Sequence, residues 1–155
     1  MLRWGLVPAW ATDEKVGYKM INARAETLNE KPAWKRLLKA RRCLVIASGF
    51  FEWKKTKDVK EPYYITTDNV ILMAGLWDEW NDLRTFTIIT TTPNKAVKSI
   101  HDRMPVILAW KEGREWLERG ELKLLKPYTE SLHVTKVSTL VNNPKNNSPR
   151  VLAAL

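Results

Sequence analysis

The stretch RCLVIASGFFEWK, residues 42–54, joins two apolar runs through a single Ser-Gly pair. Both runs, Cys43–Ala47 and Phe50–Lys54, are rich in β-branched and aromatic side chains, which favour strands. Serine and glycine are typical turn residues, so Ser48-Gly49 predicts a reversal of the chain between the runs. The stretch therefore predicts an antiparallel pair of strands.

The same pattern continues towards the C-terminus. The charged stretch 54–60 is interpreted as a solvated hairpin tip rather than a binding patch. Further strands are expected at 63–67, 71–77 and 85–91, with turns at Asp68-Asn69 and Asn81-Asp82. Outside this region, strands are expected at 3–7, 106–109 and 133–138, and loops at 9–19 and 142–149.

Helical patterns are fewer and shorter. Asn29 or a residue near it is expected to cap one helix, with Pro32 in its first turn, and this helix should end before Arg41. Because strands dominate and helices are inserted between them, we predict an α+β fold with a mostly antiparallel, barrel-like β-sheet. No linker divides the chain, so residues 1–155 are expected to form a single domain. The other helices are expected at 93–99, 112–117 and 122–125.

The composition is that of a globular domain, with 155 residues of which 45% are hydrophobic. No apolar run approaches the roughly 20 residues that a spanning helix needs, and no apolar segment follows Met1. One cysteine, Cys43, and two histidines offer neither a disulfide nor a thiolate-rich zinc site. We therefore expect a cytoplasmic protein with no membrane segment, no metal and no cofactor.

Lysine and arginine together number 26, against 17 acidic residues, which gives a net charge of +9. This excess favours a polyanionic partner, because cations that neutralise phosphates release condensed counterions. Eight tryptophans point further towards single-stranded nucleic acid, whose bases stack on aromatic rings. An indole also buries a large area, so most of the eight are expected in the core.

Three segments place side chains of catalytic type among apolar neighbours: 20–27, 49–53 and 100–105. In the second, strand alternation puts Glu52 on the opposite face from Phe51 and Trp53. In a cleft, Glu52 would have a raised pKa suited to proton transfer, whereas in solvent it would be an ordinary surface carboxylate. The sequence leaves both interpretations open.

The other two segments are equally two-sided. His101 lies between a helical pattern and a strand and is either a proton shuttle or a structural hydrogen bonder, while His133 is interpreted as structural. Asn22 and Arg24 share one side of an extended segment. They would hold a polar ligand or a phosphate there, unless Arg24 simply pairs with a carboxylate across the sheet.

Four motifs nevertheless occur together in one order: WGLVPAW at 4–10, NARAET at 22–27, RCLV leading into GFFEW at 42–53, and HDRMPV at 101–106. Their order and spacing closely resemble the SRAP family, the SOS response-associated peptidases. Four motifs in order are far more specific than any one. The resemblance runs from Arg3 through the tail VNNPKNNSP at 141–149, so it covers essentially the whole chain.

The resemblance implies a sensor of abasic sites in single-stranded DNA that crosslinks itself to the lesion. In that family the nucleophile is an N-terminal cysteine, exposed when the initiator methionine is removed. Its amine condenses with the sugar aldehyde and its thiol then closes a stable thiazolidine ring, a lyase-like chemistry in a family named as autopeptidases. The intramolecular second attack has a high effective molarity, which makes the trap irreversible in practice.

The resemblance also assigns roles to seven residues. Three would be catalytic: one orients the terminal residue, one transfers protons, and one helps to open the sugar. They are, in that order, Asn22, Glu52 and His101. The other four would contact DNA: Arg24 and Arg103 would hold phosphates, Trp10 would lie near the displaced bases, and Thr90 would line the pocket.

The sequence begins Met1-Leu2-Arg3, so we expect the N-terminal segment of the family, with its cysteine, to be missing and the chain to be inactive in crosslinking. Cys43 lies inside a strand pattern without a free amine and is interpreted as a small core residue. A non-catalytic module that binds single-stranded nucleic acid is the alternative, and an inactive fold fragment is a third. A bacterial member would be nucleoid-associated; the sequence does not define an oligomeric state.

Overall fold

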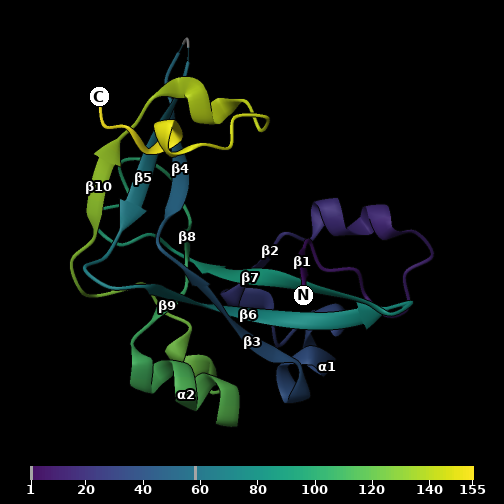
Figure 1. Cartoon of the computed structure of the whole chain (residues 1–155). Helices are drawn as coiled ribbons and strands as arrows, with labels where there is room; N and C mark the ends of the chain where they lie inside the picture. The colour runs from purple at the N-terminus through teal and green to yellow at the C-terminus, as the bar shows by residue number, and fades with distance from the viewer. Residues whose placement is uncertain (1, 58) are drawn as a thin grey trace.

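A long central hairpin organises the computed structural model, which describes residues 2–57 and 59–155. Its two strands are β6 (Ile71–Trp80) and β7 (Leu83–Thr91), which pair antiparallel from Gly75↔Ile88 to Trp80↔Leu83 (Figure 1). The turn between them has positive φ at Asn81 (45°) and Asp82 (63°). Two successive left-handed residues match the twist of a two-residue hairpin, and Asn and Asp tolerate them well.

Five further strands complete a seven-stranded mixed sheet in the order β1-β7-β6-β3, with β2, β8 and β9 attached off this path. β3 and β9 pair antiparallel with β6, and β8 pairs antiparallel with β7. β1 and β2 instead run parallel to β7. The bounds are β1 Arg3–Trp4, β2 Asn22–Arg24, β3 Arg42–Ala47, β8 Met104–Pro105 and β9 Ile107–Leu108.

A second, three-stranded sheet stands to one side of the central hairpin, in the order β10-β5-β4 (Figure 1). All its pairings are antiparallel, and β4 has β5 as its partner, from Phe50↔Ile65 to Lys55↔Lys60. β4 is therefore an edge strand. The bounds are β4 Phe50–Lys55, β5 Lys60–Thr66 and β10 His133–Lys136.

Two α-helices cover the larger sheet. α1 (Pro32–Ala40) buries Trp34 and Leu37, and α2 (Trp110–Arg119) buries Trp116, whose indole N–H donates to the Cys43 carbonyl at 3.1 Å. These side chains form one core with buried residues of β6 and β7, such as Leu76. Five 3-10 helices lie in the connections and the tail: η1 Glu14–Lys19, η2 Ala25–Thr27, η3 Leu122–Leu124, η4 Thr139–Asn142 and η5 Pro149–Leu152.

The α+β class and the mostly antiparallel pairing are confirmed, but the barrel-like form is not. In residues 2–57 and 59–155 the strands form two sheets and no closed barrel. The parallel β1 and β2 were not expected either. Both strands pair with β7, because the connection between them brings the chain back to β7 for a second time. Local turn signals do not reveal such a return.

Three local expectations were wrong. The strand expected at 3–7 ends at Trp4, because Gly5 turns away with φ 104°, and a Cβ there would lie 2.7 Å from the Gly17 carbonyl oxygen. The loop expected at 9–19 contains η1, capped by Asp13. The helix expected at 93–99 is a series of turns at 95–100, although the Asn94 side chain accepts the Ala96 and Val97 backbone N–H groups as a helix cap would.

The tryptophans also depart from expectation. Two of the eight are buried, and three are clearly exposed: Trp4 (53%), Trp10 (67%) and Trp110 (71%). Trp53 is half-buried. Across the described part of the chain, no helix combines the length and the apolar character required to cross a bilayer.

Candidate functional site

The site begins on β2, where Asn22 and Arg24 are exposed and Ala23 between them is buried. The two side chains therefore share one side, as the alternation predicts. β2 pairs parallel with β7, which sets Arg24 beside Thr90. The chain enters β2 in a fixed position because the Trp4 indole N–H donates to the Ile21 carbonyl at 2.8 Å.

Arg103 joins the end of β7 to the segment after β2. Its guanidinium donates to both carboxylate oxygens of Glu26 at 2.9 Å and to the Thr90 carbonyl at 2.7 Å. The pair with Arg103 lowers the pKa of Glu26 below its usual range. A bidentate pair of this kind is geometrically specific, so Arg103 is held in place before any ligand arrives.

His101 lies two residues before Arg103 and is oriented by it. Its Nδ1 lies 3.0 Å from the Arg103 backbone nitrogen and 3.3 Å from the Arg103 carbonyl oxygen, so the backbone of Arg103 holds the imidazole ring in place. Two carboxylates face the same nitrogen: Asp102 Oδ1 at 3.2 Å and Glu52 Oε2 at 4.0 Å. Asp102 is 89% exposed, whereas Glu52 is 20% exposed, so Glu52 is the partner shielded from water.

Glu52 lies in the middle of β4 and is removed from solvent. Burial raises the pKa of its carboxyl above the usual value, and the nearby His101 partly opposes the rise. A carboxyl with a raised pKa beside an imidazole is an arrangement suited to proton transfer near neutral pH. Of the two interpretations of Glu52, the structure supports the cleft.

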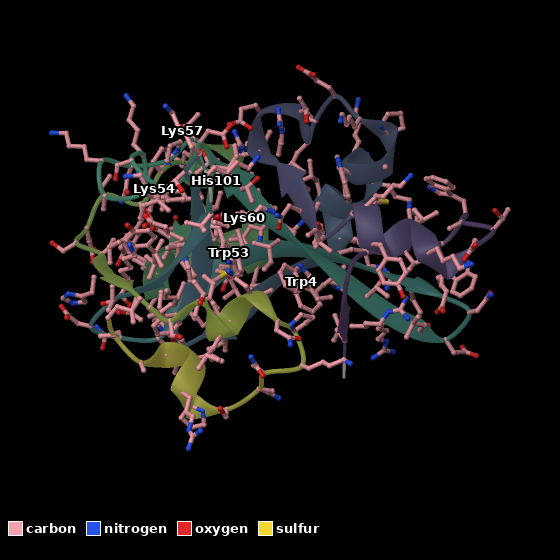
Figure 2. The ribbon with its side chains drawn as sticks, turned by 90° about the horizontal axis from the view of Figure 1, so that it is seen from above. Trp4, Trp53, Lys54, Lys57, Lys60 and His101 are labelled. Atoms are coloured by element: carbon pink, nitrogen blue, oxygen red, sulfur yellow. The ribbon has the colours of Figure 1, made fainter. Side chains whose placement is uncertain are left out.

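An open hollow of about 470 Å³ adjoins this pair. It is lined by Glu52, Trp53, Lys55, Lys60, His101 and Asn142. Both faces of β4 reach the hollow because β4 is an edge strand. Figure 2 shows Trp53, Lys60 and His101 close together in the view from above, with Trp4 further along the molecule.

The hollow also contains residues that the sequence did not single out. Lys55, Lys60 and Asn142 line it, and the Asn142 side-chain oxygen accepts the Trp53 indole N–H at 2.6 Å. Alternation along β4 places Trp53 and Lys55 on the same face, and this is the only local pattern that associates a lysine with the hollow. Nothing local indicated Asn142, because it lies 89 positions from Trp53.

The predicted residues fall into three places. Glu52 and His101 meet in the hollow, while Asn22, Arg24, Thr90 and Arg103 lie together at the end of β7 and β2. Trp10 belongs to neither group. Its neighbour Ala9 donates to Asp78, and its neighbour Ala11 accepts from Trp80, at the opposite end of the central hairpin.

The distance to Trp10 follows from the strand geometry. Asp78 pairs with Thr85, which lies five residues before Thr90 on β7. At about 3.4 Å per residue, this separates the anchor of Trp10 from Thr90 by roughly 17 Å. A ligand that touches both must span that length of the sheet.

Cys43 and His133 take no part in the site. Burial raises the pKa of the Cys43 thiol to about 12, which leaves it un-ionised and unreactive at neutral pH. His133 Nε2 lies 2.6 Å from Asp68 Oδ1 on the smaller sheet. In the described residues, no group of three or more His, Cys, Asp or Glu side chains is placed to hold a metal.

The geometry is that of a candidate acid–base pair at the rim of a hollow that also contains two lysines, and comparison with known proteins gives the family. Residues 1–144 match the model of SRAP, the SOS response associated peptidase family, and the chain belongs to that family. The resemblance found in the four motifs is confirmed.

Several relatives carry the same description. The chain is 49% identical to abasic site processing protein YoaM of Bacillus subtilis, over 99% of this chain and 74% of that protein. It is 38% identical to abasic site processing protein HMCES of Xenopus tropicalis, over 99% of this chain and 56% of that protein. A crystal structure of a Bacteroides thetaiotaomicron protein superposes with a TM-score of 0.88 at 33% identity, over 99% of this chain and 76% of that one.

Proposed function

We propose that this protein recognises abasic sites in single-stranded DNA and processes them through a covalent link. The observation that carries the proposal is the pair of Glu52 and His101, 4.0 Å apart beside a basic hollow. The names of the relatives, abasic site processing proteins, support the same substrate. The protein would then act where DNA is found, in the cytoplasm and, in a bacterium, at the nucleoid.

The DNA contacts would divide between the two groups of residues. Arg24 is exposed beside Thr90 and would bind a phosphate directly. Arg103 already binds Glu26, so a phosphate that it contacts must share the guanidinium with that carboxylate. Trp10 would meet bases several nucleotides from the lesion, given its place at the far end of the central hairpin.

The chemistry changes the bonds of one atom, the aldehyde carbon of the sugar, and each change needs a proton transfer to or from nitrogen, oxygen or sulfur. In the family, the amine of an N-terminal cysteine adds to the sugar aldehyde and one water leaves, which forms an imine. The thiol then adds to the C=N carbon, and its proton passes to the nitrogen as the ring closes. Glu52 would supply and accept these protons, His101 would help to open the sugar, and Asn22 would orient the terminal residue.

A crosslinking assay tests the proposal. The 155-residue chain, whose one cysteine is half-buried and has a raised thiol pKa, should form no heat-stable adduct with abasic single-stranded DNA on a denaturing gel. A chain extended upstream so that it starts Met-Cys should form one. In the extended chain, Glu52→Gln or His101→Ala should slow the reaction about 10²- to 10⁴-fold, the usual contribution of a positioned acid or base.

Glu61→Gln is the matched control, since Glu61 lies on the neighbouring strand β5 and pairs with Lys136 instead. It should leave the rate unchanged. A stable adduct from the 155-residue chain would show that Cys43 is reactive and overturn the assignment of the nucleophile. If the extended chain binds abasic DNA without crosslinking, the alternative function, a non-catalytic module for single-stranded nucleic acid, stands instead.

A further inference from the structure

The hairpin between β4 and β5 concentrates positive charge next to the site. Its sequence from 54 to 60 is KKTKDVK, with four lysines and one aspartate. Figure 2 labels three of them, Lys54, Lys57 and Lys60. The strands extend into this stretch, so that Lys55 ends β4 and Lys60 begins β5. Two of the lysines are therefore held by the sheet ladder rather than carried on a loose tip.

The register sets two of these lysines against each other. Lys55 and Lys60 are direct partners across the antiparallel pair, and both are exposed. Like charges directly opposite on one face destabilise a hairpin. In the described parts of the chain, neither ammonium group forms an ion pair, and the adjacent Glu61 is bound by Lys136 at 2.5 Å. The pair costs stability locally, and none of the described side chains forms an ion pair that compensates for it.

Lys54 on the same hairpin is different. It lies on the opposite face from Lys55 and directly across from Glu61. It is half-buried, and it does not line the hollow. The hairpin thus has one lysine that lies opposite an acid and does not line the hollow, and two lysines that lie opposite each other and line it.

The unbalanced pair shares the hollow with the candidate acid–base pair. Lys55 and Lys60 line the same space as Glu52 and His101, and Trp53 lines it too. A sugar placed at Glu52 and His101 has phosphates on both of its sides. Arg24 is exposed at the end of β7, where Arg103 is already bound to Glu26, and the two lysines lie on the hairpin.

We propose that Lys55 and Lys60 bind the backbone phosphates of the DNA strand on one side of the lesion, so that this flank leaves the site across the β4–β5 hairpin. The inference rests on the proposed function and adds the path of the substrate. Nucleic acid fits better than an acidic protein for a geometric reason. Lys55 and Lys60 share one hollow with the candidate acid–base pair, and a strand whose sugar lies at that pair carries regularly spaced phosphates on both sides of it.

Salt-dependent binding to undamaged single-stranded DNA tests the path. Fluorescence anisotropy would compare the chain with the double variant Lys55→Ala/Lys60→Ala. Each phosphate contact on a single strand contributes about 0.7 to the slope of log K against log salt, so the slope should fall by about 1.4. Near 0.15 M salt, this corresponds to roughly tenfold weaker binding.

Two controls separate a contact from an effect of net charge. Lys35→Ala/Lys39→Ala removes the same two charges from exposed positions of α1, and Lys54→Ala removes one charge from the other face of the hairpin. Both should keep the original slope. Equal slopes for the hairpin double variant and the α1 double variant would overturn the proposal.

A charge reversal guards against a folding artefact. Lys55→Glu places an acid opposite Lys60, which should raise Tm while weakening DNA binding more than Lys55→Ala does. Tighter or unchanged binding by this variant would refute the inference.

The flank itself is tested with abasic oligonucleotides extended on the 5′ side or on the 3′ side. The hairpin double variant should lose affinity for one of the two and keep its affinity for the other. Equal losses would contradict the path. Failure of the proposed function would look different: the original chain would bind abasic and intact strands equally, whatever the lysines do.

Discussion

The two sheets of this protein differ in how deeply their residues are buried. In β6, the six residues from Ile71 to Leu76 are all buried, whereas no residue of β4 is fully buried. The larger sheet has helices over it and forms the main core, while the smaller sheet has a free edge along β4. The candidate acid–base pair lies where they meet, with Glu52 from β4 of the smaller sheet and His101 from the segment leading into β8 of the larger one. The deepest burial therefore lies in the larger sheet, and the candidate site lies at its junction with the smaller one.

The largest expected difference between the two regions is the unfolding free energy lost when one tryptophan in each is truncated. Trp116→Ala should cost about 3–5 kcal/mol of unfolding free energy, because the indole is fully buried in the core. Trp53→Ala removes a half-buried ring and one hydrogen bond to Asn142, so it should cost about 1 kcal/mol. Urea unfolding followed by circular dichroism measures both. Equal losses would show that the smaller sheet carries as much of the stability as the larger.

A middle-sized effect is expected at the far end of the central hairpin. Asp78 is 1% exposed and accepts from the Ala9 and Glu79 backbone N–H groups and from Arg36. Asp78→Ala strands these donors and should cost about 2–3 kcal/mol. Glu79→Ala, beside it, breaks one surface pair with Arg84 and should cost less than about 1 kcal/mol. The same urea unfolding measures both costs. If Asp78→Ala left the free energy of unfolding unchanged, the role assigned to Asp78 would be contradicted.

The smallest effect is a pH dependence whose sign differs between two glutamates of the smaller sheet. The folded-state pKa of Glu52 is raised by burial, so its contribution to stability is present at low pH and is lost as pH rises through that pKa. The stability of Glu52→Gln relative to the original chain should therefore increase as pH rises from 4 to 7. The folded-state pKa of Glu61 is lowered by Lys136, so its contribution is lost as pH falls.

Glu61→Gln should accordingly lose stability relative to the original chain as pH rises towards 4.5, the ordinary pKa of a glutamate, because the window of a lowered pKa lies below that value. Thermal melts of the three proteins across the two pH ranges measure both trends. Parallel curves for the two variants would show that Glu52 is solvated like Glu61, which would remove the physical basis for its role in proton transfer.

Strand existence could be predicted from the sequence, because residues 43–47, 50–54, 63–67, 71–77 and 85–91 have strong local patterns. The ends were less predictable. Lys55 and Lys60 continue the ladder although their charge indicated a loop, since exposed edge positions tolerate lysine. The closure of the sheet was mispredicted, because pairing partners are set by tertiary contacts rather than by local turn residues.

The site shows the same division. Alternation along β2 predicted that Asn22 and Arg24 share a side. The contact between Glu52 and His101 joins residues 49 positions apart and is created by the meeting of two sheets, so only the family resemblance indicated it. The place of Trp10 at the opposite end of β7 from Thr90 depends on the hydrogen bonds of its neighbours with Asp78 and Trp80, which lie outside all four motifs.

The hydrogen bond between Trp53 and Asn142 also bears on the order in which the molecule opens. Asn142 belongs to a tail whose far end returns to the smaller sheet through the Val137↔Ala154 bridge, while the segment between them is largely exposed. Local opening events favour such lightly covered segments. When the tail lifts, the indole that lines the hollow loses its tether in the same step. Amide exchange along 139–154 therefore reports how often the hollow loses its shape, long before the core exchanges.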